Sequence, residues 1–225
     1  MDERTLADEI DRSIRMLPEP TTEAIRRIRR EYSKRLRPEP APGVVSLADA
    51  LVDRQRWVAY ELIYHHPSAL TCLGVQDVEG LARQLDSWHS VDAFGCNISG
   101  PAWRQGAIPD EAIHRWTASA DRWWRRAALV STVPLNLRSR GGTGDTRRTL
   151  DICARLASDH DDMVVKALSW ALRQLVVWDP DAVRSFLRSH QQVLAARVVR
   201  ETNHKLTTGY KNPPRSHGAG SRSRG

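Results

Sequence analysis

Cysteine is rare in this sequence, and its arrangement argues against several classes of protein. Only three cysteines occur among 225 residues, at Cys72, Cys96 and Cys153, and no two of them form a CxxC pair. Disulfide scaffolds need a dense, even set of cysteines, and structural zinc or iron–sulfur sites need closely spaced thiolates. The sequence therefore predicts a chain in a reducing compartment, without disulfides, metal or other cofactors.

Long apolar runs and strand-like alternation are also missing. No stretch approaches the ~18 consecutive apolar residues that a membrane-spanning helix needs. The first residues, MDERTLADEIDRS, are acidic and have no apolar centre, which is not the pattern of a signal peptide. No segment alternates apolar and polar residues between turns, as a half-buried strand would. We therefore expect an all-α protein of the cytoplasm that makes no membrane contact.

Lysine is scarce as well, so arginine carries nearly all of the positive charge. Lys and Arg together number 34 against 27 acidic residues, for a net charge of +7, and the only lysines are Lys34, Lys166, Lys205 and Lys211. An excess of positive charge favours a polyanionic partner. The planar guanidinium of arginine can also bind two phosphate oxygens at once.

Apolar residues recur at helical spacing through most of the chain. Pairs of helices, each pair about 35–45 residues long with short turns, favour a HEAT-like α-α superhelical solenoid of antiparallel helix pairs with one concave binding surface. We expect one such domain over residues 1–206, followed by a disordered basic tail over 207–225. Chain breaks are predicted at 38–43 and at Gly100-Pro101, and a flexible loop at 138–145. The expected helices span residues 2–16, 21–37, 46–66, 75–85, 88–97, 110–116, 121–133, 146–157, 161–178, 181–188 and 190–206.

The predicted helix over 121–133, DRWWRRAALVSTV, has two different faces. Arg122, Arg125 and Arg126 share one side, and Trp123 lies on the other. Three guanidinium groups on a helix anchored by aromatic residues would form a rigid cationic wall for phosphates. The alternative is an ordinary solvated face on a packed helix.

A second stripe of interest lies on the predicted helix over 161–178. Lys166, Ser169, Trp170 and Arg173 follow one another at the spacing of a single helical face. A tryptophan between two cations differs from an ordinary core tryptophan, although a core role is the alternative.

Trp88 and Asp92 are four residues apart, so they can meet on one helical face. A carboxylate beside aromatic rings would attract a cationic ring and would stabilise the positive charge that develops when a sugar–base bond breaks. The same carboxylate could position or deprotonate a water molecule. Alternatively, Asp92 caps a helix or pairs with a surface arginine.

Three segments in order resemble the AlkD-like family of DNA alkylation repair glycosylases. They are Trp88-His-Ser-Val-Asp92, Trp123-Trp-Arg-Arg126-Ala-Ala and Lys166-Ala-Leu-Ser-Trp170-Ala-Leu-Arg173, and the similarity is best from about residue 88 to 200. The chain has Ser87 where the family often has an aromatic residue, and His89 where the family tends to have an acid.

The resemblance implies a HEAT-like fold and removal of cationic alkylated purines, such as 3-methyladenine and 7-methylguanine, from duplex DNA. It implies that Asp92 is the catalytic carboxylate, that Trp88 and Trp170 are aromatic walls, and that Arg126 contacts the DNA backbone, with Arg173 as a weaker match. Lys166 and Arg125, neighbours of these residues, are further candidates for DNA binding.

The expected activity is therefore that of a monofunctional DNA-alkylpurine glycosylase, a hydrolase of base excision repair without lyase activity. We expect a monomer that associates with the nucleoid when it acts on alkylated double-stranded DNA. Two alternatives stay open: a non-catalytic DNA-structure binding protein on the same scaffold, and a helical-repeat protein adaptor. Release of methylated base would separate the enzyme from the binder, and salt-sensitive affinity for DNA would separate both from the adaptor.

Overall fold

The computed structural model describes residues 2–210, and within that range it contains helices and no β-strand. The predicted all-α class is therefore confirmed. No helix in this range has the length and apolar character needed to cross a membrane. The α-helices are α1 (Glu3–Arg15), α2 (Thr22–Leu36), α3 (Ala41–His65), α4 (Val75–Leu81), α5 (Trp88–Phe94), α6 (Gly100–Arg104), α7 (Asp110–Thr117), α8 (Arg122–Asn136), α9 (Thr146–Arg155), α10 (Asp162–Leu175), α11 (Pro180–Ser189) and α12 (Ala196–Thr208).

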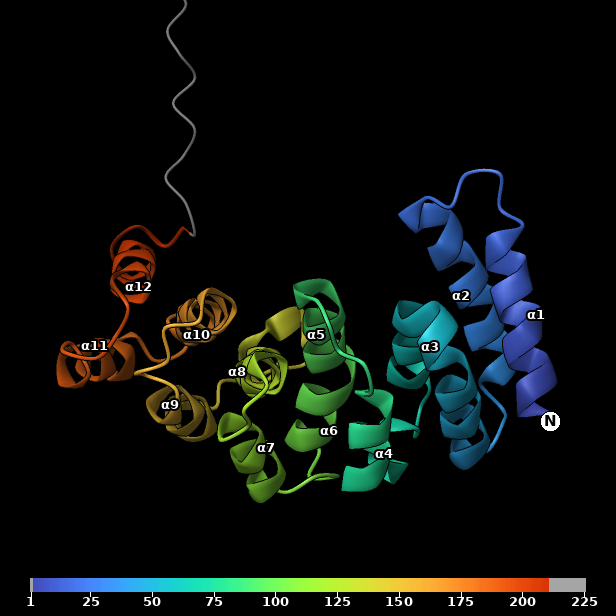
Figure 1. The fold of residues 1–225 in the computed structure, drawn as a ribbon, viewed down its shortest axis with the longest axis horizontal. Coiled ribbons are helices and arrows are strands. Elements are labelled where there is room, and N and C mark those ends of the chain that lie inside the picture. Colours follow the sequence, from blue (N-terminus) through green and yellow to red (C-terminus); the bar gives the residue numbers. More distant parts are fainter. Residues whose placement is uncertain (1, 211–225) are drawn as a thin grey trace, which may run out of the picture.

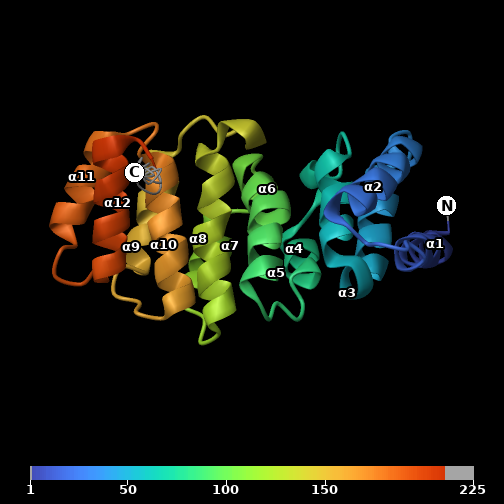
Figure 2. The same ribbon diagram turned by 90° about the horizontal axis from the view of Figure 1, so that it is seen from above.

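The helices form two layers along a curved superhelix, which confirms the predicted solenoid (Figure 1). Helices α7, α9 and α11 form the convex layer, and α8, α10 and α12 lie beside one another on the concave layer (Figures 1 and 2). The convex helices begin at residues 110, 146 and 180, which are 36 and 34 residues apart. This regular spacing is that of a helical-repeat array, in which each unit buries its apolar face against the next.

The first three helices form an N-terminal lobe at one end of the arc (Figure 1). Helix α3 begins at Ala41, within the break predicted over 38–43. Pro40 caps this helix and Pro42 lies in its first turn, where a missing backbone N–H costs no hydrogen bond. The helix is kinked at Gln55, whose side chain donates a 2.8 Å hydrogen bond to Asp11 of α1.

The predicted break at Gly100-Pro101 is wrong, because the chain stays helical from α5 to α6. A π-helical turn, Gly95–Ser99, joins the two helices, and the N–H of Gly100 donates to the carbonyl of Gly95 five residues earlier. This wider turn accommodates the proline, which cannot donate to the preceding turn.

Gly95 in this turn and Gly100 directly after it let this part of the chain pack directly on α8. A methyl group on Gly95 would lie 2.5 Å from a methyl carbon of Val130, and one on Gly100 would lie 2.6 Å from the carbonyl oxygen of Ser131. Larger residues would therefore push α5 away from α8, the helix that carries the three arginines.

Three further boundaries differ from expectation. Helix α8 continues past 133 to Asn136 with Pro134 inside it, and the segment 190–195 forms a turn before α12 begins. Thr207 and Thr208 of the predicted tail belong to α12, which ends at Gly209 with a left-handed φ of 74°. The rest of the predicted tail, 211–225, lies outside the described residues.

Candidate functional site

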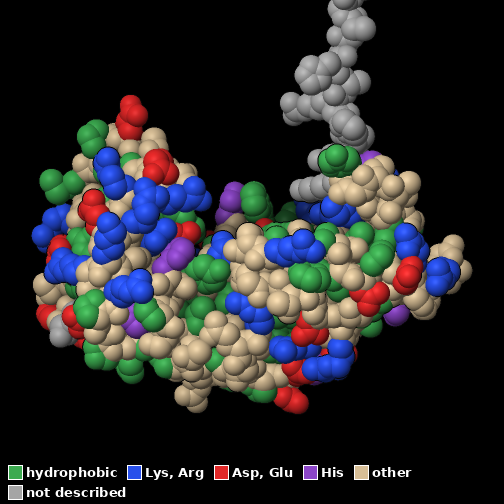
Figure 3. Space-filling view, turned by 180° about the vertical axis from the view of Figure 1, so that it is seen from behind, with side chains coloured by type: hydrophobic (Ala, Val, Ile, Leu, Met, Phe, Trp, Pro, Cys, Tyr) green, Lys and Arg blue, Asp and Glu red, His purple; other side chains and the backbone are tan. Residues whose placement is uncertain are grey.

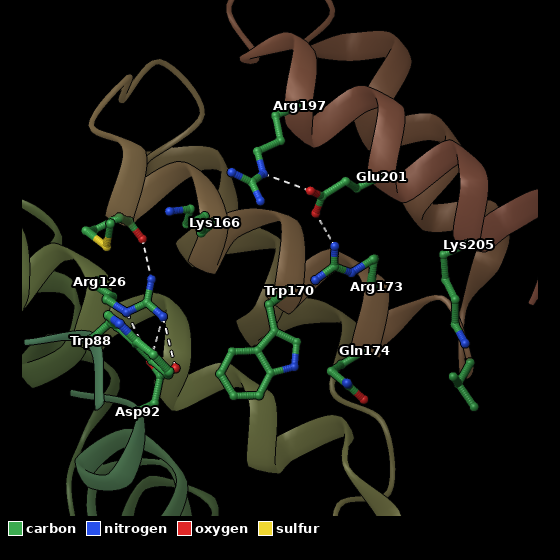
Figure 4. A pocket seen from close by; sticks show the side chains of 12 residues that line it. Trp88, Asp92, Arg126, Lys166, Trp170, Arg173, Gln174, Arg197, Glu201 and Lys205 are labelled. Atoms are coloured by element: carbon green, nitrogen blue, oxygen red, sulfur yellow. Dashed lines mark hydrogen bonds and ion pairs between the residues drawn. The ribbon is translucent and has the colours of Figure 1, made fainter. Parts of the chain in front are cut away.

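A cleft of about 710 Å³ opens on the concave face between α5, α8, α10 and α12 (Figure 4). It brings together side chains that are as much as 117 positions apart, from Trp88 to Lys205. In the space-filling view the molecule is hollowed between the N-terminal lobe and the rest of the chain, and Lys and Arg side chains gather on the lobe beside the hollow (Figure 3). The lining residues are Trp88, Asp92, Arg126, Met163, Lys166, Trp170, Arg173, Gln174, Val177, Arg197, Glu201 and Lys205.

Asp92 is held in this cleft by Arg126. Ser87 caps α5 by accepting a hydrogen bond from the backbone of Ser90, and Asp92 follows one turn later on the side that faces α8. Arg126 donates three hydrogen bonds to the Asp92 carboxylate, at 3.0, 2.8 and 3.0 Å, and a fourth to the carbonyl of Met163. This two-pronged contact fixes the plane of the carboxylate.

The charge of Asp92 is the balance of two opposing effects. Burial raises the pKa of the Asp92 carboxyl, and the attraction of Arg126, with a smaller one from His89, only partly offsets this rise. The net effect is a pKa above the usual value for aspartate. A carboxylate that is costly to ionise interacts strongly with any further positive charge that enters its site.

Two tryptophans complete this end of the cleft. Trp88 is 47% exposed and stacks on His89, with 3.3 Å between ring centroids and 28° between ring planes. Trp170 is half-buried and lies between Asp92 and the end of the cleft that Arg173 lines (Figure 4). The structure thus brings together Asp92, Trp88 and Trp170, the three residues predicted to act in catalysis.

The predicted arginine wall, however, does not exist as a free cationic surface. Arg122 lies over the Trp123 ring and 3.6 Å from a carboxylate oxygen of Asp161, and Arg125 is bound to Asp159 at 2.7 Å. Arg125 also donates to two backbone carbonyls and does not line the cleft. These pairings arise because acidic residues precede α10, next to the first turn of α8, which the sequence of α8 alone does not reveal.

The other predicted DNA-binding residues also have partners. Arg126 is buried against Asp92, although it also lines the cleft, and its predicted contact with a DNA backbone stays a prediction. Arg173 is buried and contacts Glu201 and Ser169, whereas Lys166 is at the cleft surface, 2.6 Å from Asp162. Lys166 is the most accessible of the four predicted DNA-binding residues, the others being Arg125, Arg126 and Arg173.

Sequence reasoning missed the contribution of α12. Arg197, Glu201 and Lys205 line the cleft from this helix. Their spacing of four residues was a detectable signal, but the segment carries no aromatic residue that would have drawn attention to it. Within residues 2–210, no group of three or more His, Cys, Asp or Glu side chains is arranged to hold a metal ion.

The fold and the cleft define a helical-repeat protein with a cationic concave site built around one carboxylate and two indoles. Residues 21–206 match the family model described as DNA alkylation repair enzyme. The chain therefore belongs to the DNA alkylation repair enzyme family, as its resemblance to the AlkD-like proteins predicted. The matched range includes α2 and α3, so it extends beyond the 88–200 segment in which the motifs lie. No curated protein and no solved structure gives a significant match to the chain.

Proposed function

We propose that this protein is a monofunctional DNA glycosylase that hydrolyses the N-glycosidic bond of cationic alkylated purines, such as 3-methyladenine and 7-methylguanine, in duplex DNA. The observation that carries the proposal is the Asp92 carboxylate, fixed by Arg126 and lying in an open cleft with two indoles.

The substrate class follows from charge. An N3- or N7-alkylated purine carries a positive charge, which the π faces of Trp88 and Trp170 and the Asp92 carboxylate all attract. An unmodified purine lacks that charge and gains little from this site. Because the alkylated base leaves as a neutral molecule, its departure needs no proton from an acid residue.

The protein must therefore stabilise the sugar cation and supply water. Asp92 acts as the preorganised negative charge for the developing oxocarbenium ion, and its free lone pairs orient the attacking water. Arg126 is a positioning residue, because it holds the Asp92 carboxylate in place and favours its ionised form against the effect of burial. Lys166, which lies at the cleft surface, is proposed to contact a phosphate near the lesion.

The absence of lyase activity is also part of the proposal. A lyase would need an unprotonated lysine to attack the sugar. Among the described residues, the lysines that line the cleft are Lys166 and Lys205, and Lys166 is paired with Asp162 at 2.6 Å. The expected product is an intact strand with an abasic site.

The test is single-turnover release of 7-methylguanine from methylated duplex DNA. Wild-type protein should release it, and Asp92→Asn should slow release by a factor of order 10² or more, about 2.7 kcal/mol. Because Asp92→Asn leaves the buried Arg126 without its counter-charge, the stability of the variant is measured by thermal melting and the rates are compared per folded molecule. Asp181→Asn is the control, because it also removes a carboxylate, but an exposed one outside the cleft lining that pairs only with Arg184.

Other outcomes would replace the proposal. Salt-sensitive binding to duplex without base release would indicate a DNA-structure binding protein on the same scaffold. Weak binding without salt dependence would indicate a protein adaptor. A folded Asp92→Asn variant that excises at the wild-type rate would remove Asp92 from the mechanism.

A further inference from the structure

Helix α12 presents one polar face to the cleft. Arg197, Glu201 and Lys205 are each one turn apart and all line the cleft, whereas Val198 and Thr202, one position further along, are buried. A cation, a carboxylate and a cation thus follow one another along the cleft wall, beyond Trp170 as seen from Asp92 (Figure 4).

Glu201 is the centre of this face. One of its carboxylate oxygens accepts hydrogen bonds from Arg173 and, at 2.7 Å, from the Ser169 hydroxyl, and the other accepts from Arg197 at 2.7 Å. Burial raises the pKa of the Glu201 carboxyl, but these hydrogen bonds and the two arginines lower it by a larger amount. The net pKa of Glu201 is therefore below the usual value for glutamate. Glu201 is therefore a stable negative charge among the cations at the α12 end of the cleft.

The two arginines bound to Glu201 differ in what they can reach. Arg173 is buried, and its Nη1 donates to both Glu201 and Ser169, so it is less accessible to a ligand on the surface. The Arg197 side chain is 40% exposed, and its second carboxylate contact is Asp162, at 3.5 Å, whose side chain is 61% exposed. A contact of that kind is weak in water, so a phosphate can replace it.

Five cations line the cleft, against the two carboxylates of Asp92 and Glu201. Asp92 and Arg126 form a pair at one end, so the uncompensated positive charge lies toward α10 and α12. The charges of a nucleotide with a cationic base are complementary to those of the cleft, because its base is positive and its phosphates are negative. The cleft thus matches the base at the Asp92 end and the backbone at the α12 end.

We infer that α12 is a second DNA-contact element, in which Arg197 and Lys205 bind backbone phosphates while Glu201 positions Arg197 and limits the affinity of the cleft for undamaged DNA. The inference rests on the proposed function only in requiring that the cleft binds DNA. Base release is not part of it.

The experiment measures affinity for undamaged duplex DNA as a function of salt concentration. Each lost phosphate contact flattens the log–log slope by about 0.9. Arg197→Gln and Lys205→Gln should therefore each flatten the slope by about 0.9, and the double variant by about 1.8. The matched control is Arg200→Gln, which removes the same charge from an exposed position of α12 outside the cleft and should leave the slope nearly unchanged.

Glu201→Gln tests whether Glu201 limits the affinity for undamaged DNA, and its expected effect on the salt slope is opposite in sign to that of the arginine and lysine variants. The amide keeps the shape and removes the negative charge, but its single acceptor oxygen can keep only the Ser169 and Arg173 contacts or the Arg197 contact. Affinity for undamaged duplex should rise, and the slope should steepen by up to about 0.9. If Glu201 only ties α12 to α10, the variant will melt earlier and bind no more tightly per folded molecule, and the limiting role is overturned.

The outcomes also separate this inference from the proposed function. If base release is observed but the Arg197→Gln and Lys205→Gln slopes equal that of wild type, the α12 contact is wrong and the glycosylase proposal stands. If the slopes change as expected but no base is released, α12 binds DNA and the protein is a binder. Equal effects of Arg200→Gln and Arg197→Gln would show a general charge effect and would overturn the site.

Discussion

Two buried arginine–carboxylate pairs, one in the N-terminal lobe and one in the middle of the chain, are built from the same chemical groups. Arg29 of α2 faces Glu61 of α3 at 2.8 Å, with 11% and 10% of their side chains exposed. Arg126 of α8 faces Asp92 of α5 at the same distance, with 6% and 21% exposed.

The two pairs differ in alignment and in access. The Arg29 Nε and the Glu61 Oε2 are close, but their geometry does not make a hydrogen bond, and both atoms are buried without another partner. Arg126 instead donates three aligned hydrogen bonds to Asp92, and the carboxylate borders a cleft with two indoles. A buried ion pair is thus not by itself a sign of a functional site. What distinguishes Asp92 is that its charge is oriented and open to a ligand.

The largest effect expected from this comparison is on stability, at the closed pair. Glu61→Gln leaves Arg29 buried without an opposite charge, which should cost about 3–5 kcal/mol of folding free energy. The rate of base release per folded molecule should not change, because Glu61 does not line the cleft. Chemical denaturation and single-turnover assays together measure both. A large loss of rate without loss of stability would mean that the two pairs have been assigned the wrong roles.

The close packing of Gly100, the first residue of α6, on α8 offers a second test. Gly100→Ala would place a methyl group 2.6 Å from the Ser131 carbonyl and should destabilise the fold by about 1–3 kcal/mol. It should also slow base release, because α5 carries Asp92 toward Arg126. Gly80→Ala in α4 is the control: nothing lies within 4 Å of the added carbon, and the change should stabilise the protein by about 0.5–1 kcal/mol. Equal melting temperatures for the two variants would contradict the packing argument.

The aromatic walls can be compared in the same way. Trp170→Leu keeps an apolar side chain but removes the π face, which should slow release of a cationic base by roughly 0.5–2 kcal/mol in activation free energy. Trp57→Leu is the counterpart in the N-terminal lobe, where Arg26 lies 5.6 Å from the indole centroid. Its excision rate at saturating protein should equal that of wild type. A comparable loss in both variants would indicate a general packing effect.

The smallest expected effect is the change in the rate of base release with pH as Asp92 becomes protonated. Its raised pKa places the loss of its charge above the usual range for aspartate, so the rate of base release should fall in acid before an ordinary aspartate would protonate. A carboxyl with a raised folded-state pKa contributes stability below its unfolded pKa and loses it as pH rises, so protonating Asp92 does not unfold the protein. Rates measured alongside circular dichroism should show this separation. The residual rate of Asp92→Asn should lack this acid limb, and an identical limb in that variant would assign it to another group.

Local sequence was sufficient for much of the fold and for part of the site. The helical periodicity of apolar residues predicted an all-α repeat array, since burying one face of each helix leaves few other arrangements. The four-residue spacing of Trp88 and Asp92 likewise placed both on one side of α5. The Gly100-Pro101 break was predicted wrongly because these residues interrupt helices in isolation, whereas here a π-helical turn and close packing on α8 accommodate them.

The sequence by itself thus determined the helices, the overall positive charge and the candidate catalytic residues. Only the tertiary structure decided which charges are free. It paired Arg122 and Arg125 with carboxylates of the loop before α10 and Arg126 with a carboxylate of α5. It also brought Glu201 and Arg197 of α12 to a site first recognised on α5 and α10. The physical reason is that helical periodicity acts over neighbouring turns, whereas the partner of a charge is set by packing between helices that are tens of residues apart.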